Sequence, residues 1–279
     1  MIAMPIALAV YLTRRFKSGW RLVWIGAATF ILSQVGHIPF NAWFFSLFDS
    51  GVLPTPPEQY RLVFTAILLG LSAGLWEECA RYASYRWWAK DARTWGKALV
   101  FGSGHGGIEA IILGTLVLFA FIQMIAIRTA DLSTLVPAEQ LDLAIQQVDA
   151  YWSAPWYGTI LGAVERAFSL VFHLSASVLV LQAFTRRHIR WLFLAIGWHA
   201  FVDALAVYSV GTWGPYVAEA IIGVMALISL GIIFALRDPE PEPTLTQQAE
   251  LPPVLDAAAA VGEHDFEETP QNLEDSRYN

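Results

Sequence analysis

The 279-residue chain has few charged residues and a single cysteine, and both observations limit the kind of protein that it can be. Only 15% of its residues are charged, whereas 56% are hydrophobic. A soluble domain usually has about 25% charged residues, so the composition excludes an ordinary soluble domain and predicts a multi-pass membrane protein. The single cysteine, Cys79, excludes an intrachain disulfide.

The chain also lacks a basic surface patch. Its formal net charge of −7 comes from the segment 238–279, which holds eleven of the 24 acidic residues and one of the 17 basic ones. The composition of that segment, with its Pro-Glu repeat and its run of four alanines, is typical of a disordered tail. In the remainder the basic residues are scattered at the ends of hydrophobic runs, which excludes a nucleic-acid-binding face. We therefore predict a membrane domain over 1–237 and an acidic tail over 238–279.

Long hydrophobic runs predict an all-α bundle of about seven membrane spans, because about 20 apolar residues cross a bilayer. The first run is too short to cross alone, so it is either a truncated start or an interfacial segment. The basic residues Arg14, Arg15 and Lys17 follow this run instead of preceding it, which disfavours a secretory signal peptide. The predicted spans are 2–13, 22–47, 61–84, 98–127, 156–183, 190–209 and 214–236.

Basic residues occupy every second connection between these spans, and the intervening connections are acidic or neutral. By the positive-inside rule, the basic side is cytoplasmic. The N-terminus is therefore expected outside and the C-terminus in the cytoplasm of a multi-pass protein of the cell membrane, in contact with lipid. Between two spans, Pro137–Val148 alternates apolar and polar residues, which predicts a weak amphipathic helix that acts as a lid or a surface cover.

Ionisable residues inside the spans are the main functional signal. Each costs about 2.5–3.5 kcal/mol on membrane insertion, so such groups usually serve a function. At about 1.5 Å per helical residue, most of them lie ~12–18 Å from the cytoplasmic boundary, on four successive spans. They are Glu77, Glu78 and Arg81; His105 and Glu109; His173; and His199 and Asp203.

Helical spacing predicts which of these groups face one another. His105 and Glu109 are four residues apart, as are His199 and Asp203, so each carboxylate either joins the site or orients the histidine one turn away. Glycines 102, 104, 106 and 107 would let the His105 helix approach the helix of the two adjacent glutamates.

Among the acids, Glu77 and Arg81 are also four residues apart, so the arginine is expected to hold Glu77 ionised. Glu78 is then free to act as the general base. His37 and the Glu165-Arg166 pair are weaker indicators of catalysis. His37 is interpreted as an interhelical hydrogen-bonding residue, and Glu165-Arg166, ~10 Å outward of His173, as an internal salt bridge or an outlying catalytic pair.

Four motifs occur in order on four successive spans: EExxR at 77–81, FxxxH at 101–105, ERxxxxxxH at 165–173 and HxxxD at 199–203. Over about 60–237 the chain resembles the YhfC-type intramembrane metalloproteases, which belong to the wider superfamily of CAAX prenyl endopeptidases and PrsW-type proteases. The resemblance implies a helical membrane endopeptidase that cleaves a peptide or a membrane protein.

The resemblance also implies roles for single residues. Glu78 or Glu77 would polarise a water for attack on a peptide carbonyl, and His105 would assist that water or bind metal. His199 and Asp203 would stabilise the oxyanion or complete a metal site. The sequence departs from the prenyl endopeptidases in two places: they usually show EExxxR, with the arginine one residue later, and many carry asparagine where Asp203 stands here.

Zinc is the cofactor that suits these residues. His105, His173 and His199 at one depth match the three-ligand pattern of catalytic zinc, with Glu78 as base. The chain lacks an HExxH sequence, which excludes a conventional zincin. A glutamate-activated water without metal is the competing mechanism.

Other functions stay open at this stage. Chains of Glu, Asp, Arg and His through a bundle also build proton paths, so a proton-coupled transporter is the main alternative to a peptidase. The lack of an internal repeat between the halves of the chain argues against it. A protease-like partner protein without activity and a haem protein with two histidine ligands are the remaining alternatives.

Overall fold

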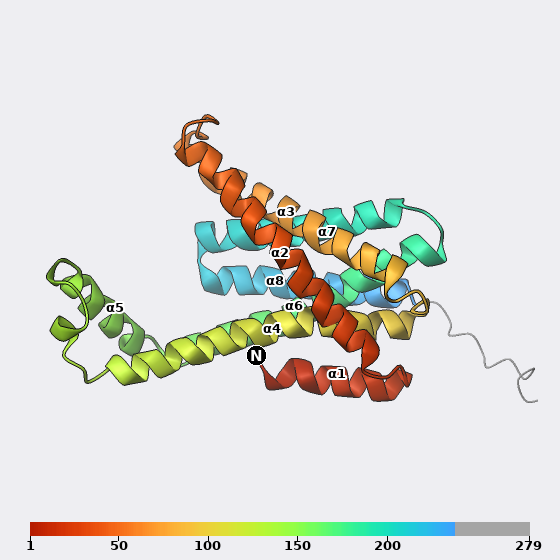
Figure 1. The fold of residues 1–279 in the computed structure, drawn as a ribbon, viewed down its shortest axis with the longest axis horizontal. Helices are drawn as coiled ribbons and strands as arrows, with labels where there is room; N and C mark the ends of the chain where they lie inside the picture. Colours follow the sequence, from red (N-terminus) through yellow and green to blue (C-terminus); the bar gives the residue numbers. More distant parts are fainter. Residues whose placement is uncertain (238–279) are drawn as a thin grey trace, which may run out of the picture. The chain divides into compact units, whose positions relative to one another are not determined.

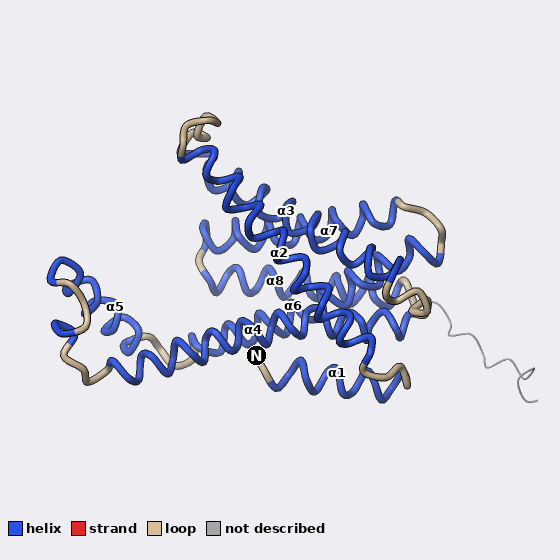
Figure 2. The backbone as a smooth tube through the Cα atoms, in the orientation of Figure 1, coloured by secondary structure: helices blue, strands red, loops and turns tan. Residues whose placement is uncertain are grey.

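The structure is a computed structural model, and it describes residues 1–237. Within this range every regular element is a helix (Figure 2). The predicted acidic tail, 238–279, lies outside the described residues. The helices are α1 (Ala3–Phe16), α2 (Arg21–Asp49), α3 (Glu58–Trp87), α4 (Trp95–Ile127), η1 (Leu132–Thr134), η2 (Ala138–Gln140), α5 (Leu141–Ser153), α6 (Gly158–Thr185), α7 (Arg190–Trp213) and α8 (Pro215–Ala235).

Six of these helices, α2, α3, α4, α6, α7 and α8, are long and apolar enough to cross a membrane. The predicted helical bundle is therefore confirmed, and each predicted span coincides with a helix. The first span differs, because α1 has only 14 residues and reaches about 21 Å. It lies along α4 (Figure 1), with its Phe16 ring 5.8 Å from the Trp95 ring. The orientation of the bundle in the membrane stays a prediction.

Glycines allow the closest helix contacts in the bundle. A Cβ atom on Gly26 of α2 or on Gly104 of α4 would overlap the backbone of the partner helix. On α4, Gly102 and Gly106 face the residues around His173 of α6 instead. The predicted close approach of α4 to α3 is therefore wrong, because these glycines bring α4 against α2 and α6 instead. The α3 helix packs closely on α7, where Gly70 meets the backbone of Ala200.

The predicted amphipathic segment forms η2 and then α5, which ends five residues later than expected, at Ser153. None of the α5 residues is buried, and large apolar side chains such as Leu143 and Ile145 are exposed. Its contacts within residues 1–237 are with α4, η1 and η2. The segment lines none of the cavities described below, so its predicted role as a lid gains no support.

An ion pair joins the start of α2 to the loop between α3 and α4. Arg21 Nη1 donates to Asp91 Oδ1 at 2.9 Å, and this bond lowers the pKa of Asp91. A carboxyl group whose pKa is lowered by folding stabilises the protein above its unfolded pKa, near 3.9, and the stabilisation is lost as the pH falls through the folded value. Because both side chains are exposed, we expect Asp91→Asn to cost only about 0.2–1 kcal/mol at pH 7.

Thermal unfolding of both proteins between pH 7 and pH 2 measures this effect. The difference between wild type and Asp91→Asn should shrink to zero at the acidic end. A difference that persists at pH 2 would mean that Asp91 acts by something other than its charge.

Candidate metal and catalytic site

The ionisable side chains of α3, α4, α6 and α7 meet in the interior of the bundle. Glu78, Arg81 and His105 have no exposed surface, and His173 and His199 are 3% and 1% exposed. Charges buried this deeply need partners, because an unpaired ion in a low-dielectric interior costs several kcal/mol. The predicted convergence of four helices is therefore present, and the pairing of the groups determines what each can do.

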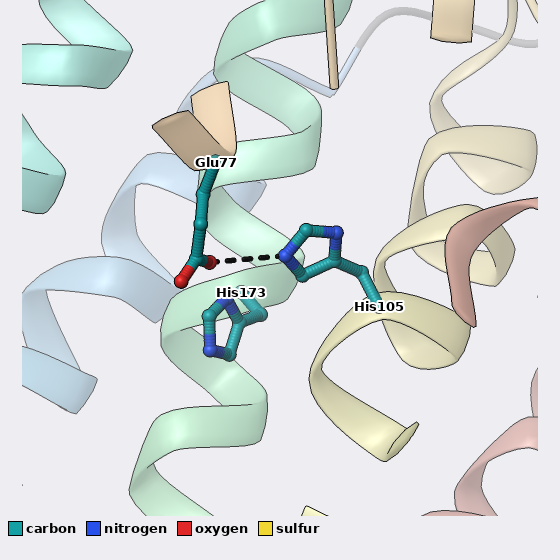
Figure 3. A group of neighbouring side chains, drawn as sticks. All are labelled: Glu77, His105 and His173. Carbon is teal, nitrogen blue, oxygen red and sulfur yellow. Dashed lines mark hydrogen bonds and ion pairs between the residues drawn. The ribbon is translucent and has the colours of Figure 1, made fainter. Parts of the chain in front are cut away.

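Glu77 lies at the centre of the cluster and uses both carboxylate oxygens. His105 Nε2 lies 3.0 Å from Oε2 (Figure 3), and Gln34 Nε2 of α2 donates to Oε1 at 3.0 Å. In the same view, the His173 ring lies beside the Glu77 carboxylate. The side chain also lines the cavity described below. Glu77 is therefore the acid of α3 that is both accessible from the cavity and adjacent to two histidines.

Glu78 has a different environment from the one predicted. Arg81 forms its ion pair with Glu78, whereas Arg81 Nη2 is 3.9 Å from Glu77 Oε2. His199 Nδ1 lies 2.6 Å from the same Glu78 oxygen. The predicted i,i+4 pair of Arg81 with Glu77 is therefore present, but Glu78, which does not line the cavity, is the closer partner of Arg81. Both i,i+3 and i,i+4 residues are neighbours on a helix, so one arginine can contact both acids.

His199 is held in one orientation by this acid. A carboxylate can only accept, so a neutral His199 donates from Nδ1 to Glu78 and its Nε2 carries the lone pair. Nε2 lies 3.9 Å from Glu77 Oε2 and 3.4 Å from Asp203 Oδ2. The predicted proximity of Asp203 to His199 is confirmed, and Nε2 faces carboxylate oxygens of Glu77 and Asp203, where it is a proton acceptor only while the imidazole is neutral.

His173 connects the inner acids to a second ion cluster. Arg81 Nη2 lies 2.9 Å from its Nδ1, and Glu109 Oε2 lies 2.5 Å from its Nε2. Glu109 was expected either to join the site or to orient His105, its neighbour on α4; it lines the cavity and pairs with His173, not with His105. Arg166 Nη1 in turn donates to Glu109 Oε1 at 2.6 Å and also contacts Glu165. The Glu165-Arg166 pair is therefore connected to the site and is not an outlying element.

A cavity of about 100 Å³ opens beside these groups, which is room for several water molecules. Its wall includes both polar and apolar side chains. The polar wall consists of Glu77, Glu109, Glu165, Arg166, Ser169, His173, His199 and Asp203, and the apolar wall of Phe168, Phe172, Val202, Ala206, Ile222, Met225 and Ala226.

The donor atoms of Glu77, His105 and His173 lie within 4.8 Å of one another. One carboxylate and two imidazoles are a ligand set of catalytic zinc, whose ligand atoms lie roughly 3.4 Å apart when each bond is about 2.1 Å. The residues therefore fit a divalent metal after a small contraction. His173 must release Arg81 or Glu109 to bind it, and the contact that remains would orient the ring.

This set differs from the predicted one, in which His199 stood in place of Glu77. The spacing of residues along helices gave the depth of each group but not the rotation of one helix against the next. Gln34 was missed altogether, because an isolated glutamine in an apolar span has no motif around it. The interhelical role of His37 is confirmed, since its Nε2 forms a hydrogen bond of 3.1 Å with Ser72 Oγ of α3.

Two adjacent glycines of α4 provide a matched test of the packing at His173. A Cβ on Gly106 would lie 2.8 Å from His173 Cβ and Cδ2, whereas one on Gly107 would lie 3.4 Å from Pro5 Cβ. We expect Gly106→Ala to displace the His173 ring and to weaken zinc binding about tenfold, as changes around a metal ligand commonly do. Gly107→Ala should leave zinc binding unchanged. Equal zinc dissociation constants for the two variants would contradict this account of the packing.

Comparison with known proteins identifies relatives of the chain. It is 29% identical over 211 residues to a protein called "Uncharacterized membrane protein YhfC" from Bacillus subtilis (strain 168), and the match covers 73% of this chain and 79% of the relative. No solved structure matches. The family described as "YhfC intramembrane metalloprotease" matches residues 1–228. With six helices of membrane-spanning length within residues 1–237, the chain is an integral membrane protein, and it belongs to the YhfC intramembrane metalloprotease family.

Proposed function

We propose that the protein is a zinc-dependent endopeptidase that hydrolyses a peptide bond within or beside the membrane. One observation carries the proposal: the donor set of Glu77, His105 and His173 lies next to the buried Glu78–His199 pair, at a cavity inside a membrane bundle. A metal, a proton acceptor and room for water are the parts that metal-assisted hydrolysis needs. The wider relationship to the CAAX and PrsW proteases stays a prediction.

Glu77, His105 and His173 would hold the zinc ion. When bound, zinc would supply Lewis acidity, which makes a water more acidic and polarises a peptide carbonyl. The Arg81 guanidinium, close to both Glu77 and His173, would limit the repulsion between the acids of the cluster. In this ligand set, Glu77 replaces His199, which was predicted as a ligand from the sequence.

His199 would act as the general base. Its Nδ1–H is committed to Glu78, so its Nε2 can accept a proton from the attacking water. Once Nε2 is protonated, Asp203 is near enough to stabilise the imidazolium at 3.4 Å. Glu78, predicted to be the base itself, would act as the residue that orients His199. The same imidazolium can then protonate the leaving amine.

The apolar wall supports a hydrophobic substrate. Phe168, Phe172, Ile222 and Met225 line the cavity together with the acids, and apolar walls select apolar side chains by burial. We therefore propose that the scissile bond lies in an apolar segment of a membrane protein or of a membrane-adjacent peptide. Lipid surrounds the bundle, and a zinc ion is the proposed cofactor.

Reconstituted protein tests the proposal by its action on a library of membrane-spanning peptides. Wild-type protein with zinc should release defined fragments, Glu77→Gln should release none, and Glu58→Gln should behave as wild type. Glu58 is a suitable control because it is on the same helix but exposed, where it pairs with Arg61. Cleavage by Glu77→Gln at the wild-type rate would overturn the proposal.

Metal removal gives an independent prediction. Treatment with a strong chelator should abolish the cleavage, and added zinc should restore it, because the ligand atoms are contributed by a preformed cluster of the folded bundle. Cleavage that survives a treatment shown to leave no protein-bound metal would favour the metal-free mechanism.

A further inference from the structure

A row of polar side chains extends from Glu77 along α2. Gln34 Nε2 donates to Glu77 Oε1 at 3.0 Å, and Gln34 Oε1 lies 3.1 Å from His37 Nδ1. His37 Nε2 accepts from Asn41 Nδ2 at 2.9 Å and also contacts Ser72. None of these α2 residues belongs to the motifs or to the cavity wall. The row is therefore a second set of polar groups at the site, with no role assigned so far.

The hydrogen-bonding capacity of each group fixes the direction of the bonds that link Glu77, Gln34, His37 and Asn41. A carboxylate only accepts, so Gln34 must turn its amide nitrogen toward Glu77 and its oxygen toward His37. That oxygen also only accepts, so His37 must carry its proton on Nδ1. Its Nε2 is then an acceptor, which agrees with the amide donor of Asn41 on that side. The proton position on His37 and the amide orientation of Gln34 are thus linked.

We infer that Gln34 and His37 are positioning residues for the proposed metal ligand Glu77. Gln34 holds Oε1, so Oε2 faces His105, and His37 keeps the amide of Gln34 from flipping. In the flipped state, the amide oxygen would lie against Glu77 Oε1, acceptor against acceptor. Partners outside the ligand set orient metal ligands in this way, and their loss commonly weakens metal affinity 10–100-fold.

This inference rests on the proposed function, and zinc affinity tests it without relying on cleavage. The probe is zinc alone, titrated by competition with a chromophoric chelator into purified full-length protein in nanodiscs. We expect Gln34→Ala to raise the zinc dissociation constant at least tenfold. The control is Ser46→Ala, on the same helix, because the Ser46 hydroxyl donates to Trp43 O of its own helix and the residue is exposed. Its zinc affinity should equal that of wild type.

Two substitutions at His37 separate positioning from mere packing. The amide nitrogen of asparagine occupies the place of Nδ1, so His37→Asn can still donate to Gln34. The amide oxygen of glutamine can reach the place of the accepting Nε2, so His37→Gln keeps the bond from Asn41 and loses the bond to Gln34. Relative to His37→Ala, we expect His37→Asn to recover zinc affinity and His37→Gln not to recover it.

The possible failures are distinguishable. Equal zinc affinities of His37→Asn and His37→Gln, or wild-type affinity of Gln34→Ala in a variant whose unfolding temperature is unchanged, would overturn the positioning role. Either result would be compatible with the proposed function, provided that Glu77→Gln no longer bound zinc. If Glu77→Gln bound zinc as tightly as wild type, the ligand assignment itself would fail.

Discussion

The His199→Asn variant is expected to lose 10²–10⁴-fold in kcat while it binds zinc as tightly as wild type. General-base catalysis commonly contributes that factor. Asparagine preserves a donor at the position of Nδ1, so the bond to the buried Glu78 carboxylate can survive. It has no counterpart of Nε2, so the proton acceptor at the cavity is lost. Steady-state cleavage of an identified membrane peptide and a zinc titration of the same sample measure the two effects.

The variant for comparison with His199→Asn is Glu77→Gln, because the Glu77 carboxylate lies 3.9 Å from His199 Nε2. It should lose zinc affinity and cleavage together, because Glu77 is proposed as a ligand and not as the base. If His199→Asn lost zinc as well, His199 would belong to the ligand set, as the sequence alone suggested. If it kept full kcat, another group of the polar wall would have to be the base.

The second large effect is on stability. Replacing Arg81 with methionine should destabilise the protein by about 3–5 kcal/mol, because it leaves the Glu78 carboxylate without its cation at a position with no exposed surface. Arg81 also contacts Nδ1 of His173, so a second buried partner is lost. Thermal or denaturant unfolding in detergent micelles, followed by tryptophan fluorescence, measures the change.

A double variant isolates the electrostatic part of this effect. Adding Glu78→Gln to Arg81→Met removes the orphaned charge, so the double variant should be more stable than Arg81→Met alone. If the double variant were less stable by the sum of the two single effects, the Glu78–Arg81 pair would contribute no coupling, and the importance assigned to it would be wrong.

Much of the fold follows from the sequence. Long apolar runs bounded by basic residues predicted helices that coincide with α2, α3, α4, α6, α7 and α8, because a bilayer leaves the backbone few alternatives to a helix. The first run was harder to interpret, since its 14-residue helix depends on packing against α4.

The sequence predicted which ionisable residues meet, but not which of them contact one another. Depth and i,i+4 spacing brought the four motifs to one level, and the ionisable residues they contain do meet. Arg81 has one acid at i,i+3 and another at i,i+4 on its own helix, and spacing alone does not say which is closer. Which acid pairs with His173 depends on how α6 is rotated against its neighbours, and no spacing within one helix contains that information. Gln34 escaped notice for the same reason, because it reaches Glu77 only through the packing of α2 on α3.

The most direct test of the account is to locate the zinc ion by anomalous diffraction from crystals of the zinc-loaded protein. We predict one anomalous peak per chain within about 2.0–2.2 Å of donor atoms of Glu77, His105 and His173, with His199 Nδ1 still bonded to Glu78. A peak coordinated by His199 and Asp203 without Glu77, or no peak among the residues of α3, α4, α6 and α7, would contradict it.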